Sequence, residues 1–188
     1  MKRKITDKSI ELFEQKGFTQ TSIQDIVNEL NVTKGTFYYY YASKEQLLMD
    51  IHLEYIDELL AKQANIIENP ASTNKEKIVG LIRQLIEDIA SKGPHGRVFF
   101  REIRHLANDN IAIVKEKRNQ VRFNIENVIQ AGIETGEFKG KLQADVVSFA
   151  VLSLTNYSYQ WFKPGGEMST EDLINYYTEI LFEGIAEE

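Results

Sequence analysis

The sequence predicts an all-α protein of about nine helices. Apolar residues recur at helical spacing along nearly the whole chain of 188 residues, and no long stretch alternates apolar and polar residues as a half-buried strand does. Only 3 prolines occur, which leaves room for long helices. Hydrophobic residues make up 43% and charged residues 27%, a balance typical of a globular protein with a sizeable core.

The composition excludes several classes of protein. The chain has no cysteine, which removes disulfides, cysteine-ligated metal sites and thiol nucleophiles. No run of about 18 apolar residues exists, and no apolar segment follows the basic start. We therefore expect a cytoplasmic protein without membrane contact. Residues 1–48 carry seven basic and six acidic side chains, whereas the chain as a whole has a net charge of −6. This asymmetry suggests a head and an acidic body with different tasks.

The first three predicted helices are short. The first has apolar positions such as Ile5 and Phe13 on one face and ends at Gly17. Residues 21–24 read as a capping box, with Thr21 as the cap of a second helix. A break at residues 31–32 separates it from a third helix, which Thr33 can cap.

Six longer helices follow. A second capping box at residues 43–46 opens a helix through Leu59. The remaining predicted helices cover residues 75–91, 96–107, 110–135, 144–162 and 170–186. Their ends are marked by residues 92–94, by Gly136 and by residues 163–166, and Ser169 and Asp172 can cap the last helix.

The tight break between the second and third helices is typical of a helix-turn-helix DNA-binding element. Four consecutive tyrosines, residues 38–41, cannot all face one core, so at least two point outward, where their hydroxyls can donate to phosphates. Gly35 allows a close approach to a DNA strand, and Lys34 and Lys44 add positive charge. A single tyrosine is more often a packing residue, but the whole run with its caps and lysines favours DNA contact.

The head resembles the DNA-binding domain of TetR-type repressors over residues 4–55. The matching segments are Gly17-Phe18, Thr21-Ser22-Ile23, Asp25-Ile26, Val32-Thr33-Lys34-Gly35-Thr36-Phe37-Tyr38 and Tyr41-Ala42-Ser43-Lys44-Glu45. Asn31 stands where a glycine is frequent, and Tyr41-Ala42 where Phe-Pro is usual. The resemblance implies a DNA-binding domain at residues 1–48 and a ligand-binding and dimerisation domain at residues 49–188.

The resemblance also implies contacts with double-stranded DNA. Lys34 and Tyr39 take the positions that read base edges, and Gly35 lies between such contacts. Positions that grip phosphates are Thr21, Thr36, Tyr38, Tyr40 and Lys44. The basic residues Lys2, Arg3 and Lys4 are either an arm that reaches a neighbouring groove or a disordered tail.

The last two predicted helices carry more apolar surface than one protomer needs. Residues 146–154 are apolar or small all round, and the last helix has apolar side chains over more than a narrow stripe, including Leu173, Leu181 and Ile185. An ordinary core within the chain is one explanation. The other, which the resemblance implies, is a homodimer through these two helices, and its two-fold symmetry suits a palindromic operator.

Besides dimerisation, we expect the body to bind a ligand. Arg97, Arg101 and Arg104 share one helix face, and arginine forks suit phosphate, although ion pairs with Glu102 and other carboxylates are an alternative. Tyr157 and Trp161, one turn apart, can flank an acyl group beside Lys163, although core packing is the commoner explanation for such an aromatic stripe. These two segments resemble the TetR-type regulators that respond to CoA thioesters of fatty acids, phenylacetate or sterol fragments. The resemblance implies an acyl-CoA effector.

Functions of other classes have less support in the sequence. The three histidines lack metal-binding spacing, and neither a nucleophile elbow nor a phosphate-binding loop occurs. We therefore expect no enzyme, no catalytic residue, no metal site and no cofactor. Two alternatives keep the fold: a regulator that senses drugs or other hydrophobic ligands, and an architectural DNA binder without an effector.

Overall fold

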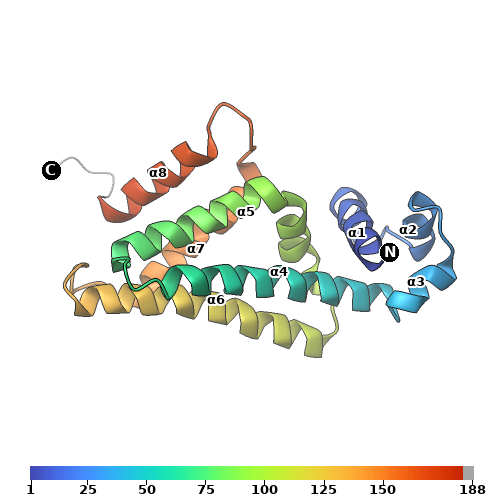
Figure 1. Cartoon of the computed structure of the whole chain (residues 1–188), viewed down its shortest axis with the longest axis horizontal. Coiled ribbons are helices and arrows are strands. Elements are labelled where there is room, and N and C mark those ends of the chain that lie inside the picture. The colour runs from blue at the N-terminus through green and yellow to red at the C-terminus, as the bar shows by residue number, and fades with distance from the viewer. Residues whose placement is uncertain (184–188) are drawn as a thin grey trace. The chain divides into compact units, whose positions relative to one another are not determined.

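The computed structural model describes residues 1–183, and these are all helix, turn and loop, with no strand among them. The predicted all-α class is confirmed (Figure 1). The helices are α1 (Lys2–Lys16), α2 (Ile23–Glu29), α3 (Lys34–Tyr40), α4 (Lys44–Ile67), α5 (Asn74–Glu102), α6 (Asn108–Glu134), α7 (Ala144–Trp161) and α8 (Thr170–Phe182). A short 3-10 helix, η1 (Ile103–His105), follows α5.

The described α-helices number eight rather than about nine because two predicted helices are joined in α5. Lys92 alone has non-helical backbone angles there (φ −132°, ψ 29°), and helical hydrogen bonding resumes directly after it. Pro94 is tolerated because it lies in the first turn beyond this kink, where its missing N–H costs no helical hydrogen bond. The predicted break at residues 92–94 is thus a kink and not a gap.

The chain forms two compact units. The head unit consists of Met1–Glu58 with Pro94–Lys117, and the body unit consists of Leu59–Gly93 with the chain from Arg118 onward. Each unit is built from discontinuous segments, because α4, α5 and α6 each contribute residues to both. The functional division after residue 48 stays a prediction.

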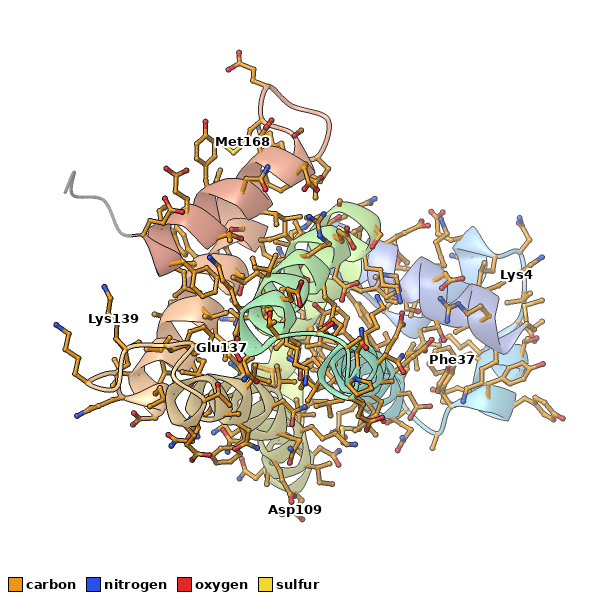
Figure 2. All side chains as sticks on the ribbon, turned by 60° about the vertical axis from the view of Figure 1, so that its left-hand side comes forward. Lys4, Phe37, Asp109, Glu137, Lys139 and Met168 are labelled. Atoms are coloured by element: carbon orange, nitrogen blue, oxygen red, sulfur yellow. The ribbon has the colours of Figure 1, made fainter. Side chains whose placement is uncertain are left out.

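The head unit is held together by fully buried apolar side chains from α1 to α4. The largest of them are Ile5, Phe13, Ile26, Phe37, Leu47 and Leu48. Phe37, labelled in Figure 2, comes from the short helix α3 and fixes it to the helices before it. Burying each such side chain contributes roughly 1.5–3 kcal/mol, which a seven-residue helix needs because it is unstable alone.

In the body unit, one apolar face of α5 is buried. Its buried side chains on α5 are Ile78, Leu81, Ile82, Leu85, Ile86 and Ile89. Helix α8 begins with the predicted cap: Ser169 and Asp172 form a reciprocal capping box. Ile185, one of the apolar residues named for the last predicted helix, lies outside the described residues.

Candidate nucleic-acid interface

The second helix begins one residue later than predicted. Ser22, not Thr21, is its cap: the Ser22 hydroxyl accepts from the backbone N–H of Asp25 at 3.1 Å. Thr21 cannot serve as the cap because it is fully buried and donates its hydroxyl to the carbonyl oxygens of Gly17 (2.9 Å) and Leu12 (3.3 Å). The predicted capping box at residues 21–24 is therefore wrong, because the helix is capped by Ser22 and not by Thr21. A phosphate contact from its side chain would require this burial to be undone.

The start of α2 is occupied by its own carboxylate. Asp25 completes the capping box by accepting from the Ser22 hydroxyl and backbone N–H, both at 2.7 Å. These hydrogen bonds hold the pKa of Asp25 below its usual range.

The turn between α2 and α3 has the form that the sequence predicts. Asn31 adopts a left-handed conformation (φ 52°), which asparagine tolerates better than most residues. The Thr33 hydroxyl then caps α3 by accepting from the backbone N–H of Thr36 at 3.3 Å. The helix-turn-helix break is confirmed.

The tyrosine run divides as expected, with two members turned outward. Tyr39 is 81% exposed and Tyr38 54%, whereas Tyr41 is buried and shares a hydrogen bond of 2.6 Å with the Thr6 hydroxyl. Burial raises the pKa of Tyr41. The half-buried Tyr40 packs edge-to-face on Tyr39, with ring centres 4.8 Å apart.

The same short helix carries three of the remaining predicted contacts on its first turn. Lys34 and Gly35 are exposed, and Thr36 is half-buried. Together with Tyr38 and Tyr39 they give α3 a surface of cationic, hydroxyl and backbone groups that can be offered to one groove. Six predicted DNA-contacting residues, counting the half-buried Tyr40, thus lie on one seven-residue helix.

Lys44 has a different environment from the one expected of a free phosphate-binding lysine. Its ammonium group donates to the carbonyl oxygens of Phe18 (2.7 Å) and Thr21 (2.6 Å) and lies 4.3 Å from the centre of the Phe18 ring. Burial lowers its pKa, and the charge of Asp25 opposes that shift. The sequence does not predict this contact, because no pattern around Gly17-Phe18 indicates that the Phe18 ring lies next to the Lys44 ammonium group.

The basic start of the chain is not a disordered tail. Lys2, Arg3 and Lys4 form the first turn of α1. The Lys2 ammonium lies 3.4 Å from the Asp50 carboxylate, and Arg3 is paired with both Glu54 and Asp7. Residues 2–4 are therefore helical, and the side chains of Lys2 and Arg3 pair with carboxylates of α4, which excludes a disordered tail.

The predicted ligand-binding arginines belong to the head unit, where two of them hold α1. Arg97 contacts the Glu14 carboxylate at 2.9 Å. Arg101 donates to the carbonyl oxygens of Phe13 (2.9 Å) and Glu14 (2.7 Å) and pairs with the buried Glu102. Arg104 is exposed, and its closest hydrogen bond is a long one of 3.4 Å to His105. The ion-pair explanation thus applies to Arg97 and Arg101.

The other predicted ligand-binding residues belong to the body unit. Tyr157 is 68% exposed and Trp161 44%, both on α7, and Lys163 is exposed just beyond its end. They are surface residues of the protomer rather than parts of its core. Ligand binding by any of these six residues stays a prediction.

Two further features of the described residues bear on function. Between residues 1 and 183 no helix is both long and apolar enough to span a membrane. The same residues contain no cluster of three or more carboxylates and histidines that could hold a metal ion.

An all-α fold with a capped three-helix head and an outward-facing polar and aromatic recognition helix defines a helix-turn-helix DNA-binding protein. The comparisons with known families agree. Residues 5–51 match the model of bacterial regulatory proteins of the tetR family, and residues 71–185 match that of the tetracyclin repressor-like C-terminal domain. The chain therefore belongs to the TetR family of transcriptional regulators and is not an enzyme.

Individual relatives align over nearly the full length. The chain is 26% identical over 178 residues to the HTH-type transcriptional repressor KstR2 of Mycobacterium tuberculosis, covering 94% of this chain and 88% of the relative. The solved structure of PfmR from Thermus thermophilus superposes with a TM-score of 0.90 at 25% identity, over 97% and 99% of the two chains. AibR, solved with isovaleryl coenzyme A and operator DNA, has the same fold, with a TM-score of 0.87 at 21% identity over 96% and 97%.

Proposed function

We propose that this protein is a homodimeric repressor that leaves a palindromic operator when a small molecule binds, and that the effector is an acyl-CoA. The DNA-binding part of the proposal depends on α3. There Lys34, Tyr38 and Tyr39 are exposed while Phe37 anchors the helix from behind. A rigid short helix with exposed cationic and hydroxyl groups is suited to insertion into a major groove.

Dimerisation is supported by apolar side chains that the protomer leaves uncovered on its last two helices. Val146, Phe149 and Tyr157 on α7 are each more than half exposed, as is Tyr176 on α8, and Ile180 is 42% exposed. Large exposed apolar residues gathered on two helices mark an interaction surface. A second copy of the chain is the proposed partner, through α7 and α8, and this symmetry would give the dimer two recognition helices for two half-sites.

The acyl-CoA effector is supported by the resemblance of residues 99–104 and 156–164 to thioester-responsive regulators. AibR adds that this fold holds an acyl-CoA and operator DNA in one protein. Among the basic positions, Arg104 and Lys163 are the best candidates for phosphate contacts, because Arg97 and Arg101 already bond carboxylates or carbonyls. Tyr157 and Trp161 stay the proposed aromatic contacts of the acyl group.

The energetic demand on the effector is modest. An effector shifts DNA binding only by the difference between its affinities for the DNA-bound and the released conformation. A roughly hundredfold loss of operator affinity corresponds to ~2.7 kcal/mol of coupling, which is usual for allosteric proteins.

The test begins with an operator selected from random DNA duplexes, which we expect to be an inverted repeat. Release of this duplex is then followed by fluorescence anisotropy during titration with decanoyl-CoA, free CoA, decanoate and tetraphenylphosphonium. Decanoyl-CoA should release the DNA, and Trp161 fluorescence should change over the same concentrations. Release by tetraphenylphosphonium alone would favour the drug-sensing alternative. Tight DNA binding that no ligand changes would favour the architectural one.

A further inference from the structure

Two buried glutamines of the body unit each have a polar atom without a hydrogen-bond partner among the described residues. Gln63 on α4 is fully buried, and Gln84 on α5 is 6% exposed. The Oε1 atom of Gln63 accepts from Asn124 on α6 at 3.0 Å, but its Nε2 atom donates to nothing in the described part of the chain. The Nε2 atom of Gln84 donates to the Leu59 carbonyl at 3.0 Å, but its Oε1 atom accepts nothing there. One donor and one acceptor are therefore left open.

The Leu59 carbonyl fixes the orientation of the Gln84 amide. A carbonyl oxygen only accepts, so the Gln84 group that faces Leu59 must be its NH2, and its oxygen must be the open atom. In the structure Asn124 accepts from Gln120 through its own oxygen at 2.8 Å and donates its NH2 to the Gln63 oxygen, so the Gln63 NH2 is the open group.

Both open atoms belong to one stretch between α4 and α5. Gln84 reaches α4 at Leu59, and Gln63 follows Leu59 by one helical turn. One turn beyond Gln84, the buried carboxylate of Asp88 is paired with Lys62 at 2.5 Å. We call Gln63, Gln84 and Asn124 the amide seam.

We propose that the amide seam binds an uncharged carboxamide group of the effector. Buried polar groups are nearly always hydrogen-bonded, so an open donor and an open acceptor in one seam indicate a missing partner that supplies both. A carboxamide does so on separate atoms: its oxygen accepts from Gln63, and its N–H donates to Gln84. A carboxylate or an ester has no donor, and either would leave Gln84 unpaired.

This proposal rests on the proposed function, in which the body unit holds a small molecule. Carboxamides from two sources fit the seam: the pantetheine arm of an acyl-CoA, which contains two secondary amides, or a ligand that is itself a simple amide. S-Decanoyl pantetheine represents the first source without the phosphates of CoA, and decanamide represents the second. Methyl decanoate and decanoate have similar chains without an N–H donor.

The experiment measures binding of these four probes to the full-length protein by isothermal titration calorimetry. The wild type should bind decanamide, S-decanoyl pantetheine or both at least about tenfold more tightly than methyl decanoate, in line with one additional buried hydrogen bond. Whichever of the two amide probes binds more tightly than the ester identifies the source of the carboxamide. Gln84→Met, which keeps side-chain length, should reduce this preference about tenfold, because the N–H of the amide then has no acceptor there. Gln63→Met should instead weaken ester and amide alike, because both offer a carbonyl oxygen to the Gln63 NH2. Gln130→Met, an exposed glutamine on α6, is the matched control.

The ester–amide comparison in the wild type needs no variant, so it remains decisive even where a methionine variant fails to fold. Equal binding of ester and amide to the wild type, or an amide preference that Gln84→Met leaves unchanged, would overturn the proposal. Operator release by decanoyl-CoA without any amide preference would overturn the proposed role of the amide seam but agree with the proposed function. Amide-dependent binding that releases no DNA would support carboxamide binding at the amide seam but contradict the proposal that this ligand is the effector.

Discussion

The ammonium group of Lys44 lies 2.7 Å from the carbonyl oxygen of Phe18 and 4.3 Å from the centre of the same residue's ring. A further hydrogen bond to the Thr21 carbonyl ties the first turn of α4 to the turn between α1 and α2. From the first turn of α4, the helix that follows the recognition helix α3, the Lys44 ammonium group thus donates to two carbonyl groups of the turn between α1 and α2. Lys44 therefore stabilises the fold of the head unit, and this role is separate from any contribution to DNA affinity.

Replacement of Lys44 by methionine should therefore destabilise the protein. The variant retains an apolar stem over Phe18 but loses two charge-assisted hydrogen bonds in a partly exposed position, which cost about 1–2 kcal/mol together. Thermal unfolding followed by circular dichroism measures the change, with Lys34→Met as an exposed control on α3. An unchanged midpoint for Lys44→Met would mean that Lys44 acts on DNA alone.

The α3 surface makes a separate prediction about DNA. Lys34→Ala should relax base preference, whereas Tyr38→Ala should weaken binding to all duplexes alike. The slope of log affinity against log salt should be about −0.9 for each phosphate that the protein neutralises, and Tyr38→Ala should leave it unchanged because tyrosine carries no positive charge. Anisotropy titrations over a salt series measure both effects, and Lys139→Ala, an exposed lysine of the body unit, is the control. Affinity that does not change with salt would exclude this surface as the DNA interface.

The exposed apolar residues of α7 and α8 predict the behaviour of the assembly. Ile180→Glu and Phe149→Glu should convert a dimer into a folded monomer, since both side chains are exposed in the protomer and would bury a charge in the dimer. Sedimentation velocity at micromolar concentration measures the mass. Ile113→Glu, comparably exposed on α6, should remain dimeric. The interface is refuted if the wild type itself sediments as a monomer.

Acid should remove a contribution of Glu137 at the start of α5. Glu137, labelled in Figure 2, accepts from the backbone N–H of Lys75 at 3.1 Å and from the side chains of Asn74 and Thr135. The hydrogen bond from Lys75 is the main reason that its pKa is lowered. A carboxyl group with a lowered pKa stabilises the fold above its usual pKa, and this stabilisation is lost as pH falls through the lowered value.

Glu137→Gln should accordingly unfold at a lower temperature than the wild type at pH 7. The difference should shrink as the pH falls to about 3, where the carboxyl group of the wild type is becoming protonated. Differential scanning calorimetry across this range measures it. A difference that stays constant with pH would show that the charge of Glu137 does not matter to the fold.

Two glycines give a matched test of packing in the body unit. A Cβ at Gly132 would overlap the Phe138 ring, whereas a Cβ at Gly140 would meet nothing within 4 Å among the described residues. Phe138 is packed against Phe182, so the ring has little freedom to move aside. Gly132→Ala should cost about 1–3 kcal/mol of stability by denaturant unfolding, and Gly140→Ala should change it by less than about 0.5 kcal/mol. Equal stability of the two variants would contradict the close packing at Gly132.

The sequence predicted the helices well because their signals are local. Gly17, with its positive φ of 85°, and the Thr33 and Ser169 caps mark helix ends within a few residues, and the structure confirms all three. The capping box of α2 was misplaced because Thr21 and Ser22 both carry a hydroxyl and a polar residue follows each by three positions. Only tertiary burial decides between them: Thr21 faces Leu12 and Gly17 inside the head.

The parts of the site that depend on distant contacts were not predictable in the same way. The partners of Lys44 are 23 and 26 residues away, and Arg101 bonds carbonyls 87 and 88 residues away. Charge spacing along one helix shows that arginines share a face but not what that face meets. The amide seam was missed because glutamine is usually a surface residue, so Gln63 and Gln84 carry no sequence signal of burial.

The discontinuous head unit sets a limit on how this regulator can be recombined. A hybrid protein that joins residues 1–48 to a foreign body would separate α1 from Arg101, whose guanidinium binds the carbonyl groups at the end of that helix. The transplantable module is instead Met1–Glu58 together with Pro94–Lys117, two stretches that must be grafted as a pair. Engineers who build biosensors by exchanging DNA specificities would need to carry both.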